Sequence, residues 1–498
     1  MSELEVTPPS LKPLLHYSSS PRDREPEQDD LAKVMKWQEE RMARKLKGEY
    51  ESAVLHLSDV IQSNLHTTMN VSSVRIEGAK ATRSSFLSFL IKPVLAAPWP
   101  KDASNLESVL HATRKISDTL QRTGIFNSVE VKLERARDEL SQPGDVDIVF
   151  KAREKGRFYL NTSTELGNNE GNAATQSATG RIRNVFGGAE VFEANVSFGT
   201  KTKRSFRASL TAPLTPDLST HGEITAYRLA RDNSSFASST EGLRGIKAAV
   251  RNGLLHRGGA HEFAYDAVLR HIGDLTPAAS ISMRESAGQT FKSALSHSYT
   301  LDTRNDRIMG SEGFYAKVFN EYAGIGGDAS HYKGELEAQF SRPLVDGLAL
   351  SLTARTGLLW GIDKPTLFSD RFQLGGPTSI RAFRANSMGP RDGSDSLGGD
   401  LHWSAGASVI SNIPTKPQWP VKTHVWANVG RLDAIDKNQT LVENVQRTLT
   451  SPSISAGVGL IYRFDPVRVE VNFGVPLVAS KSDGSRRGLQ VGMGLEFL

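Results

Sequence analysis

The chain has 498 residues, 38% of them hydrophobic, and no stretch approaches the run of about 20 apolar residues that a membrane-spanning helix needs. With 60 basic and 55 acidic residues the charge is too balanced to predict a nucleic-acid partner, and the lack of cysteine excludes disulfides and thiolate metal sites. Forty-three glycines at a mean hydropathy of −0.35 indicate a long β protein with many turns.

Residues 1–28 are rich in proline and charge, which predicts disorder. The first 20 residues resemble neither a secretory signal nor an arginine-rich transit peptide. We therefore expect a protein that stays on the cytosolic side or enters a membrane without a cleaved presequence. Helical periodicity follows over 29–70, which we interpret as a helical linker.

Residues 71–155 have the pattern of a small α+β module. A strand at 71–78 precedes two helices, and alternating strands follow near 129–133 and 146–150. Thr82 is expected to cap the first helix, and Gly124 to end the second, which starts near Asn105.

Residues 156–498 contain strand after strand in which apolar and polar residues alternate, as in Val467–Val475 and Leu489–Phe497. Sixteen such segments start near residues 157, 175, 188, 202, 219, 245, 261, 290, 313, 331, 348, 398, 421, 452, 467 and 487.

The connections between these strands predict a barrel. The longest are odd-numbered, namely Ala230–Gly245, His271–Thr290, Gly361–Leu397 and Gly430–Ser451. Short turns at one rim, long loops at the other and an even strand count are typical of a transmembrane barrel. The alternative, a soluble β-sandwich, would not need sixteen strands in one run.

No motif supports an enzyme. The chain has neither the His-Glu-x-x-His of a zinc protease nor the Gly-x-Ser-x-Gly of a serine hydrolase, and Gly375-Gly376-Pro377 is not followed by the Gly-Lys-Ser/Thr of a phosphate loop. We assign no catalytic residue, metal site or cofactor.

The long loop at 361–397 contains Leu374-Gly-Gly-Pro-Thr-Ser-Ile-Arg-Ala-Phe383. In the lumen, Arg381 would need a carboxylate or a hydrogen-bonded cage, whereas the alternative is a solvated loop charge. The predicted lumen partners are Asp400 first and Asn428 second, on strands 12 and 13.

This segment resembles the loop-six motif of the BamA-type outer-membrane assembly superfamily, (V/I)-R-G-(F/Y), which lies at the tip of a loop inserted into the barrel. Ile380, Arg381 and Phe383 match, and Ala382 replaces the usual glycine. Residues 71–155 resemble a POTRA domain. A chain with one such module and no signal sequence resembles the mitochondrial branch of the superfamily. The member of that branch is the central barrel subunit of the sorting and assembly machinery.

The resemblance implies an all-β transmembrane barrel of 16 antiparallel strands, residues 156–498, preceded by one α+β POTRA module. It implies an insertase that folds β-barrel precursors into the mitochondrial outer membrane, with metaxin-like accessory subunits on the cytosolic face. The module would face the intermembrane space and the long loops the cytosol. A protein-conducting secretion pore of the same superfamily and a barrel enzyme are the alternatives.

The resemblance also implies a lateral gate between strands 1 and 16, where a precursor's last strand would pair by β-augmentation. Strand 1 carries the polar run Asn161, Thr162, Ser163 and Thr164. Strand 16 fits the family's β-signal at Gln490, Gly492, Leu495 and Phe497, and its alternate apolar side chains are expected to face lipid. We expect strands 1 and 16 to pair, because nothing else satisfies their outer edges.

Overall fold

The computed structural model divides the chain into two compact units, residues 1–155 and 156–498. It describes residues 35–37, 39–40, 42–43, 60–96, 105–137, 142, 144–167, 173–199, 202–254, 258–413, 416, 419–464, 467–494 and 497–498. The disorder predicted for 1–28 and most of the predicted helical linker lie outside these residues. Of the linker, residues 60–63 and the short stretches from 35 to 43 are helical.

The N-terminal unit is a three-stranded sheet with two helices. Its elements are β1 (Asn70–Glu77), α4 (Ser84–Leu95), α5 (Leu106–Arg122), β2 (Phe126–Arg135) and β3 (Asp145–Glu154). The strand order is β1-β3-β2, with β1 parallel and β2 antiparallel to β3. Buried apolar residues of α5 and β3, including Ile116, Leu120 and Phe150, form the core.

The ends of the two helices differ in how they are capped. Asn105 caps α5, since its side chain accepts a hydrogen bond from the Ser108 amide, and Gly124 has the positive φ expected after a helix end. The prediction that Thr82 caps α4 is wrong. The N-cap is Arg83, and the Thr82 hydroxyl instead donates to Glu154 at 2.7 Å.

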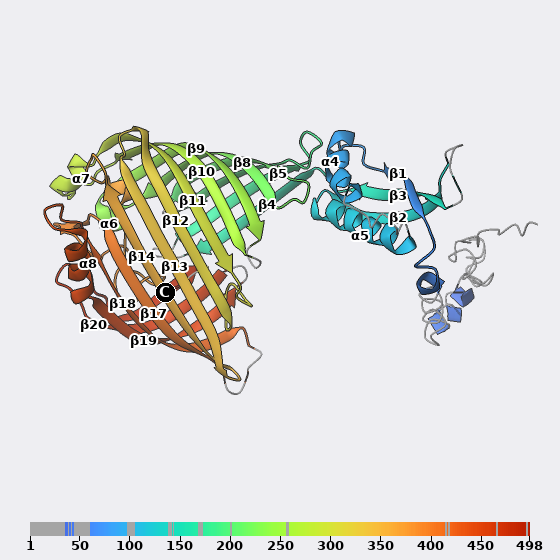
Figure 1. Ribbon diagram of the computed structural model, residues 1–498. Helices are drawn as coiled ribbons and strands as arrows, with labels where there is room; N and C mark the ends of the chain where they lie inside the picture. Colours follow the sequence, from blue (N-terminus) through green and yellow to red (C-terminus); the bar gives the residue numbers. More distant parts are fainter. Residues whose placement is uncertain are drawn as a thin grey trace, which may run out of the picture. The chain divides into compact units, whose positions relative to one another are not determined.

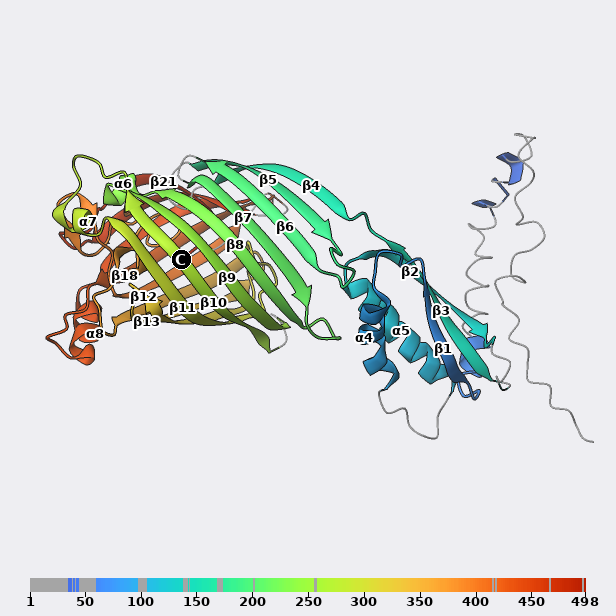
Figure 2. The same cartoon turned by 90° about the horizontal axis from the view of Figure 1, so that it is seen from above.

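Sixteen strands form one sheet in the C-terminal unit, which confirms the predicted number (Figures 1 and 2). All neighbours are antiparallel. The strands are β4 (Phe158–Gly167), β5 (Ala173–Arg183), β6 (Val191–Gly199), β7 (Thr202–Pro213), β8 (Thr220–Asp232), β9 (Thr240–Leu254), β10 (Gly259–Gly273), β11 (Gly288–Asp302), β12 (Gly313–Gly327), β13 (His331–Val345), β14 (Leu348–Gly361), β17 (Leu401–Asn412), β18 (Val421–Asp433), β19 (Ser453–Phe464), β20 (Val467–Val478) and β21 (Gly488–Gly494).

The two faces of the sheet have opposite polarity. On β18, His424, Trp426 and Asn428 are buried on the inner face, whereas Val425 between them is 60% exposed on the outer face. Large exposed apolar side chains recur on the outside of most strands, for example Ile246 and Phe263. This arrangement, apolar outside and polar inside, suits a barrel that is surrounded by lipid. Among the described residues, no helix is long and apolar enough to cross a bilayer.

The longest connections lie on one rim. They are residues 274–287, 362–400 and 434–452, and they carry the short elements α7 (Ile281–Glu285), η2 (Phe368–Asp370), β15 (Arg391–Asp392), β16 (Asp395–Ser396) and α8 (Leu441–Thr450). The predicted long loop Ala230–Gly245 is wrong in extent, because β8 and β9 continue into it and leave only 233–239 with α6 (Ser234–Ala237). We call residues 362–400 loop six.

Candidate functional site

The tip of loop six lies inside the barrel. Arg381 is fully buried, and its Nε and Nη2 donate to Oε2 of Glu470 on β20 at 3.0 and 2.9 Å. Its Nη1 donates to Oδ1 of Asn428 at 3.1 Å and to the backbone oxygen of Leu498 at 2.5 Å. Both the charge and the donors of a buried guanidinium are thus satisfied.

Of the two predicted partners of Arg381, Asn428 contacts it and Asp400 does not. Asp400 lies at the end of loop six, where its carboxylate accepts from the amide of Ile435 and is 3.9 Å from Arg371. The carboxylate that the sequence analysis missed is Glu470. It is one of three polar residues that alternate along β20, and its neighbours Arg468 and Asn472 both contact it.

Aromatic rings enclose the same guanidinium. Its Cζ is 5.3 Å from the ring centre of Trp426 and 5.8 Å from that of Phe497. Arg468 lies 5.0 Å from the Phe497 ring. Cations near ring faces are stabilised most where water is excluded, so these contacts add to the ion pair.

The tip residue Ala382 has a left-handed backbone with φ of 66°. Such a conformation is strained for any residue with a side chain, which explains why glycine is usual at this position of the motif. The amide of Ala382 donates to Oε1 of Gln490 at 2.8 Å, and Nε2 of Gln490 donates to the Phe383 oxygen at 2.9 Å. Loop six is therefore bonded to β21.

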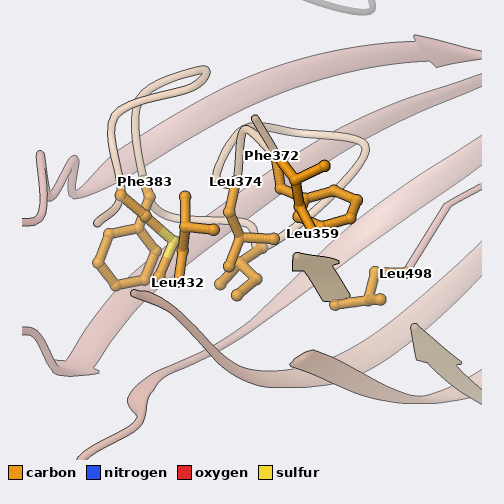
Figure 3. Packing of buried hydrophobic residues seen from close by; sticks show 8 residues of the cluster. Leu359, Phe372, Leu374, Phe383, Leu432 and Leu498 are labelled. Atoms are coloured by element: carbon orange, nitrogen blue, oxygen red, sulfur yellow. The ribbon is translucent and has the colours of Figure 1, made fainter. Parts of the chain in front are cut away.

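The apolar residues around Arg381 form a buried cluster that joins loop six to the inner wall. Figure 3 shows Phe372, Leu374 and Phe383 of the loop beside Leu359, Leu432 and Leu498. Ile380 and Met388 complete this cluster, and Ile380 is fully buried.

Glycines on the inner wall make room for the loop. A Cβ on Gly430 would be 2.6 Å from Ile380, one on Gly474 would be 2.7 Å from Trp426 and 3.2 Å from Ala382, and one on Gly492 would be 3.1 Å from Pro377. These strand glycines allow the close approach of loop six rather than forming turns.

A second buried ion pair joins loop six to the opposite part of the sheet, and sequence reasoning did not find it. Arg270 on β10 donates to both oxygens of Asp370 at 2.9 and 2.8 Å, and both side chains are almost fully buried. The partners are 100 residues apart, so no local pattern indicates the pair.

Asp370 also lies close to Glu321 and His331, a grouping of the kind that can hold a metal ion. Here, however, Lys292 lies 2.9 Å from Glu321 and Arg270 occupies both oxygens of Asp370. The site is chemically a salt-bridge network, and its two cations already balance the two carboxylates.

The outer part of loop six is bound to a neighbouring loop. Asp392 accepts from the amide and the hydroxyl of Ser282 at 3.1 and 2.8 Å, and Asp395 accepts from the amide of Ser280 at 2.8 Å. These residues lie at the start of α7 and on β15 and β16, so the rim loops form one connected structure.

The predicted gate strands are the two ends of the sheet. Within the described part of the chain, β4 pairs only with β5, and β21 pairs only with β20. The expected ladder between strands 1 and 16 is therefore absent from the residues described. On β4, Asn161 and Thr162 are exposed, and the backbones of Ser163 and Thr164 pair with Ser177 and Gln176.

At the other end, Gln490 and Gly492 face inward and Leu489 is 61% exposed on the outside. Phe497 contradicts the expected lipid-facing position. The strand ends at Gly494, and Phe497 is buried near Arg381 and Arg468, because the chain leaves the regular alternation after β21. Leu495 lies outside the described residues.

Together, a sixteen-stranded barrel, an arginine-tipped loop held inside it and a preceding α+β module define the class of outer-membrane assembly barrels. The Omp85 superfamily domain matches residues 184–497. A SAM50-like protein of Schizosaccharomyces pombe is 33% identical over 90% of this chain and 95% of its own length. Sorting and assembly machinery component 50 homolog A of Xenopus laevis is 31% identical over 86% and 90%.

Among solved structures, BamA of Haemophilus ducreyi lacking POTRA domains 1–3 has the same fold. Its TM-score is 0.71 at 17% identity, over 86% of this chain and 85% of that one. The chain belongs to the SAM50 family of the Omp85 superfamily.

Proposed function

We propose that the protein is a β-barrel insertase of the mitochondrial outer membrane that works through a lateral gate between β4 and β21. Family membership supports the general role. The observation that carries the gate is that β4 and β21 are the two ends of the sheet and share no hydrogen-bonded pair among the described residues.

Such a gate acts by lowering the free-energy cost of an unpaired strand edge in lipid. Each unpaired backbone group of a strand edge in lipid costs several kcal/mol, so a precursor strand gains by pairing with an edge that is already present. The free edge of β4 offers this template by β-augmentation. On the outer face of β4 the exposed Phe158 and Leu160 are followed by the polar Thr162, so the apolar contact with lipid decreases along the strand.

Loop six supports the other side of the gate. Gln490 binds the backbone on both sides of the tip, and Pro377 lies against Gly492. The tip of loop six therefore holds β21 in place from inside. A precursor strand can then pair at the gate between β4 and β21 while the rest of the barrel wall stays intact.

The connections support one part of the proposed topology. The chain enters β4 at the rim opposite to loop six and α8, since odd and even connections lie on opposite rims. We place the N-terminal module in the intermembrane space and the long loops, with metaxin-like accessory subunits, on the cytosolic side. Protease added to intact organelles should cleave the long loops and spare the module. Cleavage of the module before the outer membrane is ruptured would reverse this orientation.

Crosslinking tests the gate. The natural chain has no cysteine, so single cysteines can be placed at Leu160 on β4 and Leu489 on β21, both exposed on the outer face. Ile246 on β9 is a matched exposed control in the middle of the sheet, and Gln339 is an inner-face control. An arrested precursor with a cysteine in its last strand should crosslink to positions 160 and 489 and not to 246.

The second candidate is a secretion pore of the same superfamily, in which a precursor crosses the lumen. Crosslinks to position 339 alone, without either gate position, would favour the pore and overturn the gate.

A further inference from the structure

Helix α8 has an amphipathic arrangement that is the reverse of what a soluble protein would show. Its buried residues are polar, Asn444 and Thr448. Its exposed residues include four large aliphatic side chains at helical spacing: Leu441 (40%), Val442 (65%), Val445 (36%) and Leu449 (54%). On a helical projection these four share one face, while Glu443, Gln446 and Arg447 lie on another.

The buried side of the helix and its N-terminal cap fix the helix in place. Oδ1 of Asn444 accepts from the Asp436 amide at 2.9 Å, and its Nδ2 donates to the oxygens of Asp436 and Thr440. Thr440 caps the helix in a capping box with Glu443. The apolar face is thus presented by a well-determined helix, not by a frayed segment.

The helix is attached to the outer wall of the barrel. The indole nitrogen of Trp403 on β17 donates to the Thr448 oxygen at 3.0 Å, and Arg431 on β18 donates to the Ser451 oxygen at 2.5 Å. Trp403 and Arg431 are register partners, and both alternate with buried residues, so they belong to the outer face. Figure 1 shows α8 beside β18 at the end of the barrel that also carries α6 and α7.

We propose that α8 is an in-plane membrane helix whose apolar face lies in the headgroup and acyl boundary of the leaflet at the long-loop rim. The occupant is lipid, because the helix is bonded to outer-face residues of β17 and β18, and further along these strands and on β19 the same outer face carries the exposed Val425 and Val458. A tryptophan near the end of a strand is the usual residue at this depth, and a short helix with one apolar and one polar face is the usual interfacial element.

This proposal requires only a barrel in a membrane and can fail while the insertase function holds. The test uses the purified full chain alone in phosphatidylcholine–phosphatidylethanolamine vesicles, with one nitroxide-labelled cysteine at Val442 or Leu449. Gln446, exposed on the polar side of the same helix, is the matched control. Collisions with oxygen, which is concentrated in lipid, and with a water-soluble nickel chelate report the depth of each label.

Labels at 442 and 449 should favour oxygen over nickel severalfold more than the label at 446. Equal nickel access at all three positions would overturn the proposal. Protection of 442 and 449 that appears only when the accessory subunits are added would also overturn it, because the face would then be a protein-docking surface. Each labelled variant is first shown to retain the resistance of the folded barrel to unfolding in cold detergent.

Discussion

Arg381 shows most clearly how one side chain fixes the interior of this barrel. It combines an ion pair, an amide contact and a backbone contact from three separate segments, namely β20, β18 and the end of the chain. Replacing it with alanine leaves Glu470 buried without its main partner on the loop, although Arg468 remains.

Arg381→Ala should lower the free energy of unfolding by about 3–5 kcal/mol, the usual cost of removing one partner of a buried ion pair. The readouts are denaturant unfolding and protease protection of loop six. Arg384→Ala, three residues along and exposed, is the control and should change neither. If Arg381→Ala keeps the protease protection of the wild type, the contacts of Arg381 do not hold loop six in place.

Ala382→Gly should keep or raise stability, by up to about 1 kcal/mol, since glycine adopts a φ of 66° without strain. Ala382→Val should destabilise, because it adds a branched side chain to the same backbone beside Gly474. Thermal unfolding of the two variants in one detergent measures both effects. A glycine variant that is clearly less stable than a valine variant would contradict the assigned backbone.

At the scale of the elements, much of the architecture is predictable from the sequence. Period-two alternation fixes the face of each residue, and the predicted strand starts differ from the observed ones by at most five residues, at β9 (245 against Thr240). The loop-six motif placed Ile380, Arg381 and Phe383 in the lumen, where all three are buried.

The sequence could not predict which inner residue meets the loop. Alternation shows that Glu470 faces inward, but Asp400 and Asn428 do so equally, and only the depth reached by the loop decides among them. The Arg270–Asp370 pair depends on the closure of the sheet over 100 residues, and the inward turn of Phe497 breaks the local period.

Strand glycines should tolerate substitution very differently according to what faces them, whether they lie on the inner wall, as Gly474 does, or on the outer face, as Gly180 does. Gly474→Val should cost about 1–3 kcal/mol, because the new side chain meets the Trp426 ring. Gly180→Val on β5, where nothing lies within 4 Å of the added Cβ, is the control and should cost about 0.5 kcal/mol or less. Equal effects in denaturant unfolding would mean that Trp426 and the tip of loop six do not need the space at Gly474.

In the N-terminal module, the hydroxyl of Ser73 lowers the pKa of Asp147 through a hydrogen bond at 2.7 Å, and Arg75 lowers it further, while burial acts in the opposite sense. Because the folded pKa lies below the ordinary value of 3.8, this carboxylate stabilises the module above that pH. The stabilisation should decrease as the pH falls through the folded pKa.

Hydrogen exchange of the β1 and β3 amides in the full chain, corrected for intrinsic rates, measures this dependence between pH 7 and pH 3. Asp147→Asn should show weaker protection at pH 7 and a flatter profile. An unchanged profile would assign the acid sensitivity to other carboxylates.

The sixteen-stranded sheet of residues 156–498 has one interrupted ladder, between β4 and β21, among the residues described. Cysteines at Ser163 on β4 and Gly494 on β21 should form a disulfide whenever the two ends meet. On the proposed mechanism the bond blocks precursor release, while the barrel stays folded and its accessory subunits stay bound. The measurement is precursor assembly before and after reduction. Full assembly with the bond completely formed would remove lateral gating from the mechanism.

The binding of loop six to β21, but not to β4 in the part of the chain that is described, has a consequence for the order of events. A visiting strand that displaced β21 would have to break the Gln490 contacts and disturb the core around Arg381. A strand that adds to β4 breaks none of the interior contacts seen in the described part of the chain. On the proposed mechanism, entry at β4 comes first and is readily reversed, and exchange at β21 comes last and is slow. This order would let the proposed gate release a poorly matched segment before the interior of the barrel is disturbed.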